Sequence, residues 1–210
     1  HLPFHYKSLW VNHCNRKQLI VKNEQGYTGM INIDNKQIIP CQYGSLSLFS
    51  PDLLYASKDE QFGLINYQNE VVIPLQYEEE MIGNTMFLCN DNSAQYFYAV
   101  KNGKKGLLNL KGEVTIPLIY DELSFLSDDH DYFSITIGEK YGVVDKHGRI
   151  IIPARYDYIR YEENNVFEVT LYEEDDIFSG KCGIVDNRNK TIVPIRYDYV
   201  TTVSENGNLL

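Results

Sequence analysis

Carboxylates are the most numerous side chains in this sequence that can do chemistry, and many of them gather in three short runs. Closely spaced carboxylates attract a basic partner and speed its encounter with the protein, so we take these runs as candidate partner-binding residues. They comprise Glu78, Glu79 and Glu80; Asp128, Asp129 and Asp131; and Glu173, Glu174, Asp175 and Asp176. Two other interpretations stay open: solvated surface loops, and a calcium site, for which the D-x-[DN]-x-[DN]-G loop is missing.

Nucleophiles and metal ligands are scattered along the chain. His13 and Cys14 are adjacent, but neighbouring residues of a strand point to opposite faces and do not form a catalytic pair. No C-x-x-C pair gives zinc-ligand spacing, and the G-x-S-x-G, H-E-x-x-H, P-loop and G-x-G-x-x-G motifs are absent. We expect buried free thiols at Cys14, Cys41, Cys89 and Cys182. We therefore expect no enzymatic activity, no metal and no cofactor.

The charge balance and the hydropathy limit the classes of partner. The chain of 210 residues has 29 aspartates and glutamates against 19 lysines and arginines, a formal net charge of −10. Nucleic-acid binding is driven by basic side chains that displace counterions, so we expect no nucleic-acid partner. No apolar run approaches the roughly 20 residues that span a bilayer. A packed, soluble protein without membrane insertion is expected.

A repeat supplies the elements that position these side chains. Five segments align without gaps on a glycine, an asparagine or aspartate three residues later, a proline eleven later and a tyrosine fourteen later. The segments are TGMINIDNKQIIPCQY, FGLINYQNEVVIPLQY, KGLLNLKGEVTIPLIY, YGVVDKHGRIIIPARY and CGIVDNRNKTIVPIRY. Their glycines are Gly29, Gly63, Gly106, Gly142 and Gly183, and their tyrosines are Tyr43, Tyr77, Tyr120, Tyr156 and Tyr197. A partial copy with Pro3 and Tyr6 opens the chain, and the mean spacing of about 38 residues is typical of solenoids and propellers.

Each motif position has a physical interpretation. Six residues after the glycine stands an asparagine or glycine, both of which tolerate positive φ, and this predicts a hairpin with a two-residue turn. The flanking strands are apolar at successive positions, so sheets must stack on sheets. Proline is expected to end the second strand because it lacks an N–H. The tyrosine is expected to bury its ring.

Two further strand-like stretches lie between each tyrosine and the next glycine. Each repeat therefore predicts four short antiparallel strands, and no window has convincing helical periodicity. The tyrosine-to-glycine spacing varies, which places extra loops at about Met86 to Gln95 and Glu173 to Gly180. Insertions in repeat proteins are surface loops that often bind partners.

The repeat resembles the WG-repeat family of bacterial proteins, and the resemblance covers nearly the whole chain. In that family an aromatic residue, usually tryptophan, precedes the glycine, whereas this chain has Thr28, Phe62, Lys105, Tyr141 and Cys182. The resemblance implies scaffolds and components of bacterial interaction or conflict systems rather than one reaction. It also implies a bacterial protein, with the cytoplasm favoured and an exported form left open.

The fold prediction is an all-β tandem array of about five antiparallel hairpin or four-strand repeats. An open, β-solenoid-like superhelix is slightly favoured over a five-bladed β-propeller, because equivalent repeat positions occur at both ends of the chain. We expect a single repeat domain over residues 1–210. It divides into a partial repeat at 1–18, repeats at about 19–50, 51–84, 85–127, 128–162 and 163–203, and a tail at 204–210.

The leading functional hypothesis is a non-catalytic protein–protein interaction scaffold. Its expected partner is another protein, and a basic one if the acidic runs take part. A narrower alternative is an acidic immunity or inhibitor protein that neutralises a basic bacterial toxin. Two further alternatives are a glycan-binding module that uses exposed tyrosines and a hydrolase that uses paired carboxylates.

Overall fold

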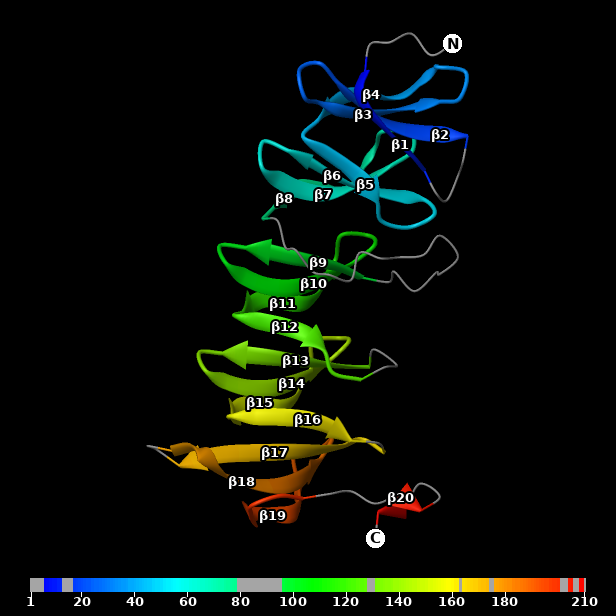
Figure 1. Cartoon of the computed structure of the whole chain (residues 1–210). Coiled ribbons are helices and arrows are strands. Elements are labelled where there is room, and N and C mark those ends of the chain that lie inside the picture. Colours follow the sequence, from blue (N-terminus) through cyan, green and yellow to red (C-terminus); the bar gives the residue numbers. More distant parts are fainter. Residues whose placement is uncertain are drawn as a thin grey trace. The chain divides into compact units, whose positions relative to one another are not determined.

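The computed structural model describes residues 6–12, 17–78, 96–127, 131–162, 164–173, 176–200, 204–205 and 208–209. All regular secondary structure in these ranges is β-strand (Figure 1). None of the described residues forms a helix that could cross a membrane. By contact clustering the chain divides into two compact units, His1–Gly103 with Leu107–Val114, and Lys104–Gly106 with Thr115–Leu210.

Antiparallel sheets follow one another in chain order. The first sheet contains β1 (Tyr6–Val11), β2 (Gln18–Asn23), β3 (Thr28–Asn32) and β4 (Gln37–Tyr43). The second contains β5 (Ser45–Leu48), β6 (Leu53–Lys58), β7 (Gln61–Asn66) and β8 (Val71–Tyr77), and the third, among described residues, β9 (Tyr96–Lys101), β10 (Lys104–Asn109) and β11 (Val114–Tyr120). The fourth contains β12 (Glu122–Phe125), β13 (Tyr132–Ile137), β14 (Lys140–Asp145) and β15 (Ile150–Tyr156). The fifth contains β16 (Tyr158–Glu162), β17 (Val166–Glu173), β18 (Asp176–Asp186) and β19 (Thr191–Tyr197), and β20 (Ser204–Glu205) pairs with β21 (Asn208–Leu209).

The expected all-β array of antiparallel four-strand repeats is confirmed. Each of the five sheets ends at a motif tyrosine, and the second, fourth and fifth sheets begin two residues after the preceding tyrosine. The repeat expected at residues 128–162 therefore contains the last three strands of the fourth sheet and the first strand of the fifth. The extra segment expected as a loop at Glu173 to Gly180 belongs in part to a longer hairpin, because Tyr172 pairs with Gly180 and Glu173 with Asp176.

Successive sheets within each unit bury an apolar layer between them. We call the face that a sheet turns toward the next sheet its forward face, and the opposite face its rear face. In the second unit the forward face of the fourth sheet packs on the rear face of the fifth. The forward residues are Val143, Ile152 and Tyr156, and the rear residues are Ile159, Phe167, Val169 and Val185. In the first unit, Met30 and Ile39 pack in the same way against Leu54 and Ile65.

The motif glycine lies where the neighbouring strand bulges over it. Tyr141 pairs with Tyr156 and Val143 with Ile152, so the single residue Gly142 faces three residues of β15. A Cβ atom on Gly142 would lie 2.7 Å from the backbone nitrogen of Ala154. No side chain fits at that distance. Proline does not end the strand as expected: β15 runs through Pro153 to the tyrosine, because the bulge removes this position from the hydrogen-bond ladder.

The hairpin turn is a three-residue loop rather than the expected two-residue turn. In the third sheet the amide nitrogen of Gly112 donates to the carbonyl oxygen of Asn109 at 2.9 Å, and that of Asn109 to the carbonyl oxygen of Glu113 at 2.9 Å. The Asn109 Oδ1 atom also accepts hydrogen bonds from the backbone nitrogens of Lys111 and Glu113. Asn32, Asn66, Asp145 and Asp186 make the same pair of contacts. This side-chain acceptor stabilises a turn that needs only one residue at positive φ, whereas a type I′ turn needs two.

Candidate functional site

The motif tyrosines show which sheet faces are covered. Four of them are buried, with exposed fractions of 5% for Tyr43, 6% for Tyr77 and 2% for both Tyr120 and Tyr156. Tyr197, at the same position of the fifth sheet, is 40% exposed. The forward face of the fifth sheet is therefore uncovered along β19.

The residues beside Tyr197 lead to the same conclusion. Ile192 is 48% exposed, whereas Ile151 at the equivalent position of β15 is 7% exposed. Val193 is half-buried, whereas its equivalent Ile152 is fully buried. We name Ile192, Val193 and Tyr197 the β19 strip. The loss of the cover that equivalent residues of the fourth sheet have makes this strip a candidate contact site.

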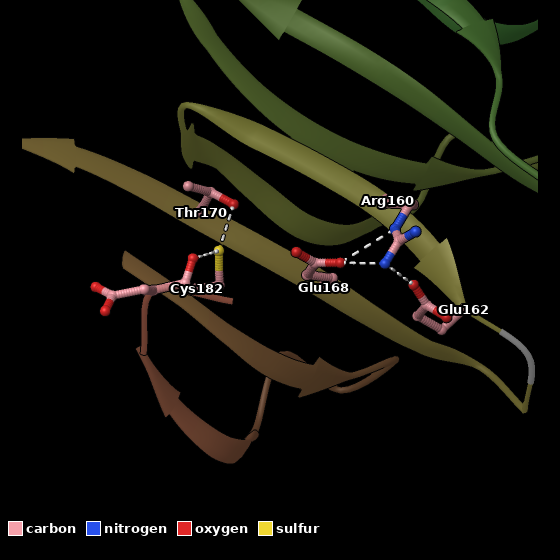
Figure 2. Close-up of polar contacts among 6 residues, drawn as sticks. Arg160, Glu162, Glu168, Thr170 and Cys182 are labelled. Atoms are coloured by element: carbon pink, nitrogen blue, oxygen red, sulfur yellow. Dashed lines mark hydrogen bonds and ion pairs between the residues drawn. The ribbon is translucent and has the colours of Figure 1, made fainter. Parts of the chain in front are cut away.

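On the forward face of the fifth sheet, the residues of the two central strands, β17 and β18, are covered. Thr170 is 6% exposed, Cys182 8% and Ile184 1%. Figure 2 shows the Cys182 thiol close to the Thr170 hydroxyl, and the two atoms are 3.4 Å apart. The thiol also donates a hydrogen bond to the backbone carbonyl oxygen of Asp198 at 3.8 Å. Thr28, which also precedes a motif glycine, donates similarly to the carbonyl oxygen of Gly44. In the first and fifth sheets, the residue before the glycine thus connects its strand to the segment that follows the tyrosine.

Arg160, Glu162 and Glu168 form an ionic triad on β16 and β17, at the edge of the forward face of the fifth sheet (Figure 2). The Arg160 guanidinium donates to Glu168 Oε2 from Nε at 3.1 Å and from Nη2 at 2.5 Å, and its Nη2 lies 2.8 Å from Glu162 Oε1. The hydrogen bond to Glu168 raises the pKa of Arg160 despite partial burial. At the equivalent pair of the fourth sheet stand Ser124 and Ser134. The triad carries two carboxylates and one guanidinium, so this edge has a net negative charge.

Of the acidic residues expected to bind a partner, the side chains of two are described. The Glu78 carboxylate accepts hydrogen bonds from the backbone nitrogens of Asn102 at 2.6 Å and Gly103 at 3.2 Å. Asp131 forms an ion pair with Lys146 at 2.6 Å. The structure describes only the backbone pairing of Glu173 with Asp176. Glu79, Glu80, Asp128, Asp129, Glu174 and Asp175 lie outside the described residues.

The contact made by Glu78 belongs to a pattern that the sequence interpretation missed. An acidic residue follows the motif tyrosine and connects its sheet to the next one. Asp157 Oδ1 lies 2.5 Å from Lys140 Nζ, and its Oδ2 accepts from the backbone nitrogen of Tyr172 on the fifth sheet at 2.9 Å. Burial raises the pKa of Asp157, but these two hydrogen bonds outweigh it and the net pKa lies below its usual value. The sequence signal was a lysine and an aspartate 17 residues apart, which also pairs Lys104 with Asp121 and Lys181 with Asp198.

The scattered histidines and cysteines form no metal-binding cluster in the described part of the chain, where no group of three or more His, Cys, Asp or Glu side chains converges. Cys182 is a buried free thiol, as expected. Cys41 is also free but only half-buried, and burial raises the pKa of its thiol. His13, Cys14 and Cys89 lie outside the described residues.

Comparison with known proteins identifies the repeat. The model of a family described as "WG containing repeat" matches residues 29–60, 62–84, 106–141, 141–172 and 183–209, which together make up more than half of the chain. No curated protein gives a significant match. The structure is similar to that of a eukaryotic initiation factor at 11% identity and a TM-score of 0.43, covering 90% of this chain and 54% of that one. It is also similar to the WD40 β-propeller domain of Doa1 at 8% identity and a TM-score of 0.33, covering 90% of this chain and 71% of that one. The chain spans about half the length of the initiation factor.

Proposed function

Because the chain belongs to the family of WG-containing repeat proteins, we propose that it is a non-catalytic scaffold that binds another protein chain through the forward face of its fifth sheet. The β19 strip carries this proposal. The equivalents of Val193 and Tyr197 are buried in all four preceding sheets, and the equivalent of Ile192 is buried in the fourth, so these residues have the composition of an interface core. Interface cores are enriched in aromatic and apolar side chains of this type.

The fixed positions of the repeat support a scaffold. Glycine makes room for the bulge, asparagine or aspartate closes the turn, and proline occupies the bulge. The tyrosine fills the space between sheets in four of the five repeats. These residues are engaged in holding the sheets, and the side chains beside them differ from repeat to repeat. A rigid frame with variable surface positions is the usual basis of binding by repeat proteins.

The described carboxylates favour binding over hydrolysis. Glu78 and Asp131 are engaged with backbone N–H groups and a lysine, and Asp157 joins two sheets. Four of the five motif tyrosines are buried, which removes most of the motif positions from the glycan-binding alternative. The net charge of −10 and the negative edge at Glu162 and Glu168 support a basic partner. A toxin-neutralising role is the narrower form of this proposal.

Affinity capture from a lysate of the source organism tests the proposal. The full chain is the bait, and the comparison is between wild type, Ile192→Arg on the β19 strip, and the control Val71→Arg, which replaces an apolar residue that is 57% exposed on β8. A protein retained by wild type and by the control but lost with Ile192→Arg is the expected result. Capture that does not depend on Ile192, or no capture by wild type, contradicts the proposal.

A salt series in the same experiment tests the charge of the partner. Raising the ionic strength from about 0.05 M to about 0.5 M shortens the screening length several-fold and weakens contacts between exposed charges. A basic partner bound at the acidic edge is expected to be lost at the higher salt concentration. Retention at both concentrations would leave an apolar contact and contradict the charge-based part of the proposal.

A further inference from the structure

We propose that the β19 strip binds the turn between β3 and β4 of a second copy of this chain, so that copies associate head to tail. This inference rests on the proposed function, because it names a second copy as the chain that the strip binds. Since both copies are acidic, it replaces the basic partner of the charge-based part of that proposal. The argument comes from the contacts that join successive sheets inside each unit, since they show what a covered strip contacts.

Inside the molecule, a motif tyrosine meets the turn asparagine of the next sheet. The Tyr43 hydroxyl donates to Asn69 Oδ1 at 2.7 Å. In the second unit, Arg155 Nη2 donates to the Tyr156 hydroxyl at 2.7 Å and to Asn189 Oδ1 at 3.2 Å. A covered strip therefore presents a tyrosine hydroxyl to a turn that carries an asparagine acceptor at positive φ.

The β19 strip supplies the tyrosine side of such a contact. Arg196 Nη2 donates to the Tyr197 hydroxyl at 3.1 Å, and the guanidinium lies 5.2 Å from the centre of the Tyr197 ring. Arg155 is placed in the same way on Tyr156, 4.9 Å from that ring. The arrangement that holds Asn189 against the fourth sheet is thus already formed at Tyr197, where the ring is 40% exposed.

The turn between β3 and β4 has the asparagine half. Asn35 has the position and the positive φ of Asn69, yet its Oδ1 atom is shielded from solvent and has no hydrogen-bond partner in the described structure. A buried acceptor without a donor is unfavourable, so the turn gains free energy if it shifts on association and lets the Tyr197 hydroxyl of a second copy reach Asn35 Oδ1. Ile33 of the same turn is 54% exposed, whereas its equivalent Tyr67 packs against the core shared with the preceding sheet.

The two halves also match in polarity and charge. Ile33 and Ile192 are both exposed apolar residues, and the turn carries Asp34 whereas Arg196 stands beside the strip. Because the central rows around Ile184 are already covered, the contact involves the turn and β19 rather than two whole sheet faces. The two surfaces differ, so the contact is heterologous, and each copy retains one free half for a further copy.

Sedimentation velocity on the purified full chain tests the inference. Wild type is expected to form dimers and longer species as the concentration rises. Ile192→Arg blocks the strip and Ile33→Arg blocks the turn, so each variant alone is expected to be monomeric. Mixed in equal amounts, the two variants each supply the half that the other lacks, and a dimer without longer species is expected. Val71→Arg is the matched control and is expected to associate like wild type.

Three results would overturn the inference. The first is a wild type that stays monomeric up to about 100 µM, which places Kd above that value. The second is association of either single variant by itself. The third is a mixture of the two variants that does not dimerise. Circular dichroism and thermal melting of each variant check that it is folded, which both exposed positions should permit. A monomeric wild type that still captures a source protein in an Ile192-dependent way would overturn only this inference, whereas failure of that capture would overturn the proposed function.

Discussion

At the scale of single residues, the motif glycines and prolines have unequal importance. A Cβ on Gly106 would lie 2.6 Å from the carbonyl oxygen of Ile116 and 2.8 Å from the carbonyl carbon of Pro117, and both are backbone atoms of β11 that cannot rotate away. Pro117 itself is exposed. We expect Gly106→Val to lower the free energy of unfolding by about 3 kcal/mol or more, and Pro117→Ala by about 1 kcal/mol or less. Urea denaturation of the two variants compares them directly, and equal losses would contradict the role assigned to the glycine.

The motif tyrosines give a second prediction at this scale, with a control inside the chain. The Tyr43 hydroxyl donates to Asn69 Oδ1, whereas the turn after Tyr120 carries Gly148, which has no side-chain acceptor. Removing a net hydrogen bond costs about 1 kcal/mol. We therefore expect Tyr43→Phe to lower the free energy of unfolding by about that amount and Tyr120→Phe to change it by less than about half as much. Thermal melting measures both, and a larger effect at Tyr120 would contradict the assignment.

At the scale of elements, sheets are joined by the acidic residue that follows the tyrosine. Because the pKa of Asp157 is lower in the folded protein than its usual value, its carboxylate stabilises the fold above about pH 4, and this contribution is lost as the pH falls through the folded pKa. Asp157→Asn removes the ionisable group and its ion pair with Lys140.

We therefore expect Asp157→Asn to be less stable than wild type at neutral pH and to lose less further stability between about pH 5 and pH 2. Melting temperatures measured across this range check the prediction. Asp59→Asn, at an exposed turn position, is the matched control and is expected to follow wild type. Parallel curves for wild type and Asp157→Asn would show that the carboxylate does not stabilise the junction.

At the scale of the whole molecule, the order of positions within the repeats leads to a prediction about the radius of gyration. The sequence has equivalent repeat positions at Tyr6 and Tyr197, and on this ground alone we predict an open superhelix rather than a closed ring. A compact chain of 210 residues has a radius of gyration of about 17 Å. We expect small-angle X-ray scattering of the monomeric Ile192→Arg variant to give a clearly larger value. A value near the compact one would favour a closed propeller.

The sequence by itself determined the repeat, its all-β character and the four-strand unit. These follow from local signals: a turn residue that tolerates positive φ, short runs of successive apolar residues and a glycine at constant spacing. The sequence also predicted buried free thiols, which is right for Cys182, whereas Cys41 is free but only half-buried. Local rules were sufficient because each strand pairs with its neighbour along the chain.

Only the tertiary structure decided how the sheets are joined and where they are left uncovered. The strand that continues through proline depends on a bulge over glycine, which is a contact between two strands. In the sequence, Glu78 is one member of an acidic run. In the structure, its carboxylate accepts hydrogen bonds from the backbone of the next hairpin. The sequence also did not predict that the β19 strip is exposed, because Tyr197 has the same sequence context as four buried tyrosines. Burial is a property of what lies against a residue, and the sequence of a repeat is nearly the same whether or not another sheet covers it.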